Sequence, residues 1–206
     1  SLDGRTALPN GSSQWISGPP ARAWVHRLRA QCDAVLVGGG TLRADNPLLT
    51  SRGQRSPEPL RVVLTRSLDL PSTAQLWDQS EAATLVLHGI DAPPERQQQL
   101  DRLGVEHLAL QDCQPKAALE LLAQRGCNQV LWECGPELAA AALRAVVRPV
   151  AIAAALEAAA SASTTSIITT TSITTASVTT TSNTTSSCTI RSRVNTSSTT
   201  TCIVYI

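Results

Sequence analysis

Two glycine-containing turns hold the residues of this chain that are best suited to bind a ligand. The first reads Gly38-Gly39-Gly40-Thr41 after a short apolar segment, and the second reads Glu133-Cys134-Gly135-Pro136 before an alanine-rich stretch. Glycine lets a ligand approach the backbone closely, and the free N–H groups at the start of a helix attract a phosphate. The two turns therefore predict a site for a phosphate-bearing ligand, with the carboxylate of Glu133 near hydroxyl groups of that ligand.

Each turn also has a purely structural interpretation, because a tight connection between a strand and a helix needs the same glycines. Neither stretch matches the GxGxxG dinucleotide fingerprint or a phosphate-binding P-loop. Two such turns at the carboxyl edge of one sheet are more informative than either alone, since ligands of open α/β sheets bind in that crevice.

Two arginines, Arg29 and Arg52, are candidates to bind the phosphate, because a guanidinium group matches phosphate oxygens with paired hydrogen bonds. A solvated surface position is the alternative for each of them, and His26 is predicted to be solvated. No serine-nucleophile motif accompanies His88 or His107, so a hydrolytic triad is not expected.

The elements that position these residues follow from an alternation of apolar strands and amphipathic helices. Five strands are predicted, at Asp33–Val37, Leu60–Leu64, Ala83–His88, Val105–Leu110 and Gln129–Glu133. Four helices are predicted, over residues 21–32 and at Glu95–Leu103, Lys116–Gln124 and Pro136–Val146. Loops are expected at Asp69–Ser80 and Asp91–Pro94. Strands separated by helices predict a mainly parallel sheet that is covered on both faces.

The stretch from Ala158 to Ile206 has a different composition, with 28 Ser or Thr among its 49 residues and no Gly, Pro or Asp. One interpretation is a disordered hydroxyl-rich linker. Another is that its β-branched runs form strands that complete a single domain over residues 1–206. Several strands without turn-forming residues are improbable, so a third interpretation is that this stretch does not copy a natural sequence. The runs lie at Ser166–Thr171, Val178–Thr181, Cys188–Val194 and Thr200–Ile206.

The bulk composition excludes several classes of protein. The net charge of +1 gives no support to a nucleic-acid partner or an acidic tail. The chain has neither a signal-peptide pattern nor an apolar run of about 18 residues, so we expect a cytoplasmic protein with no membrane partner. Its six cysteines lack zinc-ligand spacing, so we expect reduced core thiols and no metal. Met is absent even at position 1, which suggests that the numbering begins inside a longer chain.

Six stretches within Ser1–Ala145 jointly resemble the reductase domain of riboflavin biosynthesis, because their order and spacing agree with that family. The family domain is the C-terminal part of the bifunctional diaminohydroxyphosphoribosylaminopyrimidine deaminase/5-amino-6-(5-phosphoribosylamino)uracil reductase. The stretches are SLDGRTA, SQWIS, the R…H.LRA helix, DAVLVGGGTLRADNPLLTSR, PLRVVLT and VLWECGPELAAAALRA. The resemblance implies a dihydrofolate-reductase-like, three-layer α/β fold with a mainly parallel central sheet, and a homodimer.

The resemblance also implies an activity and site residues. The activity is NADPH-dependent reduction of the ribosyl group of 5-amino-6-(5-phosphoribosylamino)uracil, or of its diamino-pyrimidinone form, to the ribityl group. Substrate-binding positions are Ser13, Arg29, the backbone at Leu49, Arg52 and Glu133. Cofactor-binding positions are Trp15, Thr41, Asp45, Gly135, Pro136, Glu137, Leu138, Ala139, Ala140 and Ala141. Asp45 is in addition the expected catalytic residue, which relays a proton to the substrate nitrogen.

The chain departs from the family pattern in three places. The zinc deaminase that precedes this domain in bifunctional proteins is absent, so its natural fusion is an expectation only. Arg66 follows LRVVLT and would suit the 2′-phosphate of NADPH. After Ala145 the usual family segments are not found, although Val146–Ile206 has about their length and Val150–Leu156 is a candidate strand.

Two alternatives to this reductase function stay open. They are a dihydrofolate reductase and a catalytically idle nucleotide-binding or dimerisation module.

Overall fold

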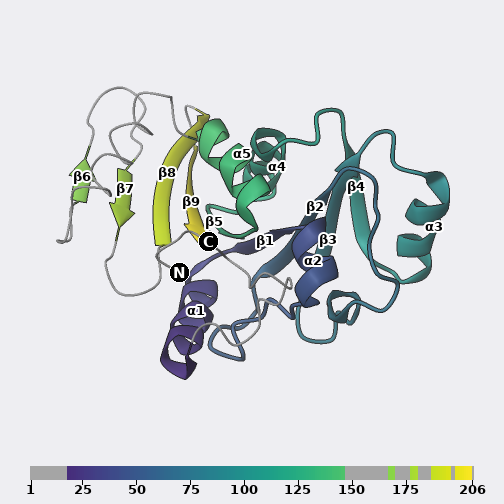
Figure 1. Cartoon of the computed structure of the whole chain (residues 1–206), viewed down its shortest axis with the longest axis horizontal. Helices are drawn as coiled ribbons and strands as arrows, with labels where there is room; N and C mark the ends of the chain where they lie inside the picture. Colours follow the sequence, from purple (N-terminus) through teal and green to yellow (C-terminus); the bar gives the residue numbers. More distant parts are fainter. Residues whose placement is uncertain (1–17, 147–166, 170–176, 181–186, 196–197, 206) are drawn as a thin grey trace.

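The computed structural model describes residues 18–146, 167–169, 177–180, 187–195 and 198–205 (Figure 1). In these residues the strands form one sheet in the order β4-β3-β2-β1-β5-β9-β8-β7-β6. The strands are β1 (Ala34–Gly38), β2 (Leu60–Thr65), β3 (Thr84–Gly89), β4 (Glu106–Leu110), β5 (Gln129–Glu133), β6 (Ile167–Thr169), β7 (Ser177–Thr180), β8 (Ser187–Asn195) and β9 (Ser198–Tyr205). The helices are α1 (Pro19–Gln31), α2 (Gly39–Asp45), α3 (Pro94–Arg102), α4 (Pro115–Gln124) and α5 (Pro136–Val146), with a 3-10 turn η1 (Gln75–Trp77).

The sheet is mainly parallel, as predicted. Strands β4, β3, β2, β1, β5 and β9 pair in parallel, and β8, β7 and β6 continue the sheet in antiparallel register. The five strands predicted before residue 134 are confirmed, with bounds within one residue of the expected ones. Parallel neighbours need crossover connections. Helices α2, α3 and α4 lie in the connections β1–β2, β3–β4 and β4–β5, whereas the connection β2–β3 contains the 3-10 turn η1.

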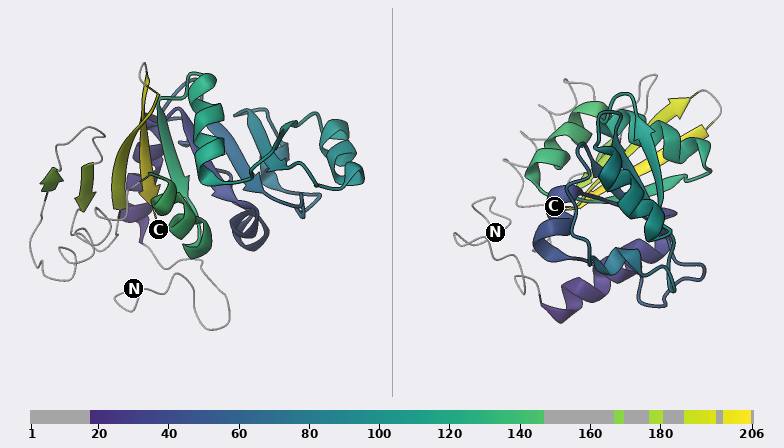
Figure 2. Two further views of the ribbon diagram at one scale, coloured as in Figure 1. Left: turned by 90° about the horizontal axis from the view of Figure 1, so that it is seen from above. Right: turned by 90° about the vertical axis from the view of Figure 1, so that its right-hand side faces the viewer.

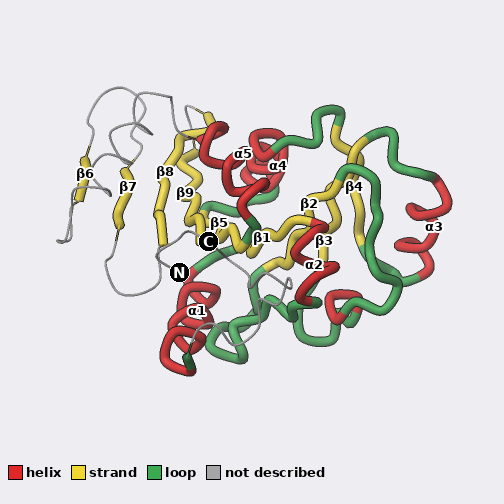
Figure 3. The backbone as a smooth tube through the Cα atoms, viewed as in Figure 1, coloured by secondary structure: helices red, strands yellow, loops and turns green. Residues whose placement is uncertain are grey.

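Helices cover both faces of the sheet, so the molecule has three layers (Figures 2 and 3). Successive residues of β1 show why: Ala34 and Leu36 belong to one apolar cluster, whereas Val35 and Val37 belong to the other. The first cluster is completed by α4 and α5, and the second by side chains of α1, α2 and α3. A strand buried on both faces needs a largely apolar sequence, which is the pattern that β1, β2 and β3 have. Strand β2 also buries Arg61, whose guanidinium donates to the carbonyl oxygens of Leu76, Asp78 and Ala82.

Proline marks the starts of four helices. It stands in the first turn of α1, α3, α4 and α5, where its fixed φ suits the helix and its missing N–H costs no intrahelical bond. These four helices are confirmed to within two residues of their expected bounds. The seven-residue α2 was not predicted, because two turns are too short for a periodic pattern. Thr41 lies inside α2, and no side chain caps the start of this helix.

Close packing explains the first two glycines of the triple-glycine turn. A Cβ on Gly39 would lie 3.0 Å from Oγ1 of Thr65, and one on Gly38 would lie 3.2 Å from Cδ2 of Leu138. These contacts bring α2 against β2, and the end of β1 against α5. Gly38 and Gly39 therefore have the structural role that the sequence left open.

Parts of the Ser/Thr-rich stretch form the strands β6 to β9 (Figure 1). Strand β9 pairs with β5 from Gln129↔Thr201 to Glu133↔Tyr205 and so covers the edge of β5. The candidate strand Val150–Leu156 lies outside the described residues. Among the described helices, none is long and apolar enough to cross a membrane.

Candidate active site

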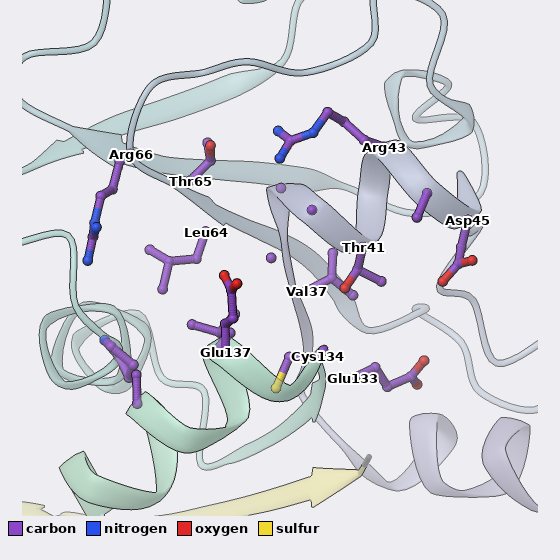
Figure 4. A pocket seen from close by; sticks show the side chains of 18 of the residues that line it. Val37, Thr41, Arg43, Asp45, Leu64, Thr65, Arg66, Glu133, Cys134 and Glu137 are labelled. Atoms are coloured by element: carbon purple, nitrogen blue, oxygen red, sulfur yellow. The ribbon is translucent and has the colours of Figure 1, made fainter. Parts of the chain in front are cut away.

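The carboxyl ends of β1, β2 and β5 open onto a cleft with a volume of about 940 Å³ (Figure 4). Both glycine turns line it, together with the start of α5 and the connection that leads into α4. The two turns, almost a hundred residues apart in the sequence, are thus brought together at one edge of the sheet. This is the place where open α/β sheets bind ligands.

The third glycine of the first turn and the glycine of the second turn leave space in the cleft. A Cβ built on Gly135 would meet no atom within 4 Å, and one on Gly40 would meet only a guanidinium nitrogen of Arg43 at 4.0 Å. Packing inside the protein therefore does not require glycine at either position. A ligand that approaches the backbone closely does give a reason for it.

Glu133, at the end of β5, is held by a bidentate salt bridge. Nε and one terminal nitrogen of Arg29 donate to the two carboxylate oxygens, each at 2.7 Å, and the other terminal nitrogen donates to the carbonyl oxygen of Thr50 at 3.0 Å. The side chains of Arg29 and Glu133 are only 12% and 14% exposed. The bridge fixes the carboxylate orientation and neutralises its charge, because both hydrogen bonds are charge-assisted.

Arg29 itself does not line the cleft; Glu133 does. The sequence assigned these two residues to separate parts of a substrate, and the structure pairs them directly. His26, which was expected to be solvated, is partly buried on the same helix. Burial, together with the nearby Arg29 charge, lowers the pKa of His26.

Arg52 lies on an exposed loop that a second carboxylate organises. Glu58 accepts hydrogen bonds from the backbone N–H of Ser51 at 2.6 Å, from the Ser51 hydroxyl at 2.8 Å and from the N–H of Gly53 at 2.9 Å. Burial alone would raise the pKa of Glu58, but the bonds from Ser51 and Gly53 outweigh it and lower the pKa. The carboxylate therefore stays ionised and holds both neighbours of Arg52.

Charged side chains line the cleft at both of its ends (Figure 4). Glu133 and Asp45 lie at one end, and Arg66 lies at the other. Arg43 is the other cation that lines the cleft. One of its terminal nitrogens donates to the backbone carbonyl oxygen of Asp69 at 2.6 Å and lies 3.7 Å from the carboxylate of the same residue. Among the described residues Arg66 has no ion-pair partner, so its charge is available to an anion in the cleft.

Two thiols line the cleft without offering a nucleophile. Burial raises the pKa of the Cys134 thiol to about 12, and burial also raises the pKa of Cys113. The thiolate is the reactive form of cysteine. These two cysteines are therefore neutral near pH 7, and the cleft is equipped for binding and orientation.

A sequence model of one family, the RibD C-terminal domain, matches residues 1–148. This chain belongs to the RibD C-terminal domain family. The resemblance inferred from the six sequence stretches is thereby confirmed. The match ends close to the last residue of α5, so it leaves out the Ser/Thr-rich stretch.

Individual relatives agree with this membership. The chain is 52% identical over 142 residues to the riboflavin biosynthesis protein RibD of Synechocystis sp. The matched region covers 69% of the chain and 39% of the relative. It is 42% identical over 146 residues to the chloroplastic riboflavin biosynthesis protein PYRR of Arabidopsis thaliana, which covers 71% of the chain and 24% of the relative. The chain thus spans about two fifths or less of these curated relatives.

Solved structures confirm the dihydrofolate-reductase-like fold. The diaminohydroxyphosphoribosylaminopyrimidine deaminase/5-amino-6-(5-phosphoribosylamino)uracil reductase of Thermotoga maritima superposes with a TM-score of 0.57 at 34% identity, over 69% of this chain and 39% of that one. A pyrimidine reductase-like protein of Corynebacterium diphtheriae gives a TM-score of 0.60 at 24% identity, over 83% and 82% of the two chains. The second likeness concerns the fold alone.

The site residues expected for a RibD C-terminal domain fall into three groups. Lining the cleft are Thr41, Asp45, Leu49, Glu133, Gly135, Glu137, Leu138 and Ala141. The lining does not include Arg29, Arg52, Pro136, Ala139 and Ala140. Ala139 is 1% exposed and packs into an apolar cluster, because its face of α5 points to the sheet. Ser13 and Trp15 lie outside the described residues.

The sequence missed one wall of the cleft, formed by Ser67, Cys113, Gln114 and Pro115. The thiol of Cys113 donates to the carbonyl oxygen of Thr65 at 3.3 Å and so joins two segments 48 residues apart. The one available signal was strand order. Since β2 pairs with β1, the residues after β2 must reach the same edge as the triple-glycine turn.

Proposed function

We propose that this chain reduces the ribosyl group of 5-amino-6-(5-phosphoribosylamino)uracil to the ribityl group with NADPH. The observation that carries the proposal is the single cleft that both glycine turns and a fixed carboxylate share. Family membership supports it, and so does the reductase activity of the Thermotoga relative.

The residues of the cleft fit a dinucleotide cofactor. The open space at Gly135 is a cradle that any larger residue would fill, and the N–H groups that follow Pro136 favour a phosphate. We assign Thr41, Asp45 and the cleft-lining residues of the Gly135–Ala141 segment to NADPH. When bound, NADPH supplies the hydride that reduces C1′ of the open-chain imine form of the substrate.

The remaining residues of the proposal orient the substrate. Glu133, fixed by Arg29, accepts hydrogen bonds from ribose hydroxyl groups, and Arg52 binds the ribose phosphate with Ser13 and the backbone at Leu49. Asp45, exposed at the end of α2, relays a proton to the substrate nitrogen. The protein thereby contributes orientation and charge neutralisation.

The proposal extends to the setting of the protein. We propose a cytoplasmic homodimer, whose natural form carries an N-terminal zinc deaminase domain. The chain matches only 39% and 24% of the length of two curated relatives, and this supports such a fusion.

The decisive experiment follows NADPH oxidation by nicotinamide absorbance in the presence of the phosphoribosylamino-uracil. We expect oxidation that depends on this substrate and does not occur with dihydrofolate. NADPH binding without turnover would identify an idle nucleotide-binding module, and turnover of dihydrofolate would identify a dihydrofolate reductase.

Replacing Arg52 with alanine is expected to weaken substrate capture roughly 10- to 100-fold, the scale of a lost hydrogen bond to a charged group. NADPH affinity should stay near the wild-type value, because the proposal assigns Arg52 to the substrate phosphate and not to the cofactor. Steady-state KM values for both ligands measure this. A loss of NADPH affinity with normal substrate capture would show that Arg52 has another role.

Replacing Arg66 with glutamine is expected to reduce the preference for NADPH over NADH by about tenfold, since the 2′-phosphate loses a charge-assisted partner. Affinity for NADH is unchanged. Arg43→Gln is the matched control, because Arg43 lines the same cleft but is already engaged by Asp69. Equal effects of the two variants on the NADPH/NADH ratio would contradict the assignment.

A further inference from the structure

We propose that Glu58 is a positioning residue, whose carboxylate holds the Thr50–Gly53 segment in the conformation that presents Arg52 to the substrate phosphate. The inference rests on the proposed function, and it adds a residue that neither the sequence nor the family comparison singles out. Glu58 does not line the cleft, so it acts through the loop and not by contact with substrate.

The contacts of Glu58 flank Arg52 on both sides. Its carboxylate binds the N–H and hydroxyl groups of Ser51, directly before Arg52, and the N–H of Gly53, directly after it. The Ser51 hydroxyl also accepts a hydrogen bond from the backbone N–H of Arg55 at 3.1 Å. Ser51 is fully buried, whereas Arg52 is exposed. The loop is thus fixed from the inside while its arginine faces outward.

The backbone conformation explains why such an anchor is needed. Arg52 has a φ of +58° and Gly53 a φ of +76°, so two successive residues are left-handed. This region disfavours every residue with a Cβ, and an arginine stays there only where its surroundings determine the conformation. Backbone N–H groups in a tight turn can form a concave site for an anion. Here the Glu58 carboxylate is that anion.

A second set of contacts ties the same loop to the cleft. The carbonyl oxygen of Thr50 accepts a hydrogen bond from Arg29, and Arg29 holds Glu133 at the end of β5. The loop that carries Arg52 is therefore fixed relative to the carboxylate proposed to bind the ribose hydroxyl groups. One chain of contacts, from Glu58 to Glu133, sets the spacing between the two ends of a ribose phosphate.

The test is Glu58→Gln, which keeps the size of the side chain but replaces one acceptor oxygen with an amide. We expect KM for the phosphoribosylamino-uracil to rise about tenfold, with kcat and NADPH affinity near wild type. In an Arg52→Ala background the same change should add nothing to KM, because the arginine to be positioned is gone. Glu106→Gln is the matched control. Glu106 lies on the edge strand β4, and its carboxylate is likewise held by a hydrogen-bonding partner, Arg125.

A readout independent of activity follows the loop itself. Amide hydrogen exchange at Ser51 and Gly53, and trypsin cleavage after Arg52, are both expected to be faster in Glu58→Gln than in the wild type or Glu106→Gln. Unchanged exchange, or an equal rise in KM with and without Arg52, would overturn the inference. A wild type that binds NADPH but neither binds ribose 5-phosphate nor reduces the substrate would instead overturn the proposed function.

Discussion

Gly135→Val is expected to weaken NADPH binding roughly 10- to 100-fold, the cost of forcing extra methyl groups into a filled space. The free protein should fold normally, because a Cβ at this position meets no atom within 4 Å. The clash therefore arises only when a ligand occupies the cleft. Fluorescence titration with NADPH measures the affinity, and thermal unfolding measures the fold.

Two further glycine variants make this result specific. Gly135→Ala adds one carbon and should show an intermediate loss of NADPH affinity. Gly39→Ala should lower the melting temperature instead, since its Cβ would lie 3.0 Å from Oγ1 of Thr65 inside the packed protein. A Gly135→Val protein that binds NADPH as tightly as the wild type would remove the second turn from the cofactor site.

Much of the fold could be predicted because its strands are buried on both faces. Apolar runs such as Val35–Val37 cannot be surface strands, and the helices that follow β1, β3, β4 and β5 begin with glycine or proline. The carboxyl ends of parallel strands meet at one edge, so placing Gly38–Gly40 and Gly135 together required no knowledge of side-chain contacts. The cleft that both turns line confirms that they meet.

What the sequence could not provide was the pairing of distant polar groups. Arg29 and Glu133 are 104 residues apart, and nothing in either segment indicates the other. The same is true of Cys113 and Thr65, whose contact closes the wall of the cleft. Short elements were also missed: α2 has seven residues, too few to show a helical period. Local patterns report how a segment folds, but tertiary packing alone decides which side chains meet.

The second large effect is expected on the free energy of unfolding, when the salt bridge between Arg29 and Glu133 is broken. Glu133→Gln leaves the Arg29 guanidinium mostly buried without a countercharge, and this is expected to cost about 3 kcal/mol of unfolding free energy. Urea denaturation measures it. Glu106→Gln is again the control: the Arg125–Glu106 side chains are 34% and 51% exposed, so its loss should cost less than about 1 kcal/mol.

A double variant separates the structural part of the bridge from its part in binding. In Arg29→Met/Glu133→Gln the unpaired charge is gone, so stability should recover most of what Glu133→Gln loses, by the coupling expected of contacting residues. Substrate capture should stay impaired, because the carboxylate proposed to hold the ribose hydroxyl groups is still missing. If the double variant regains wild-type KM along with stability, Glu133 serves the fold alone and the ribose must be bound by other groups of the cleft.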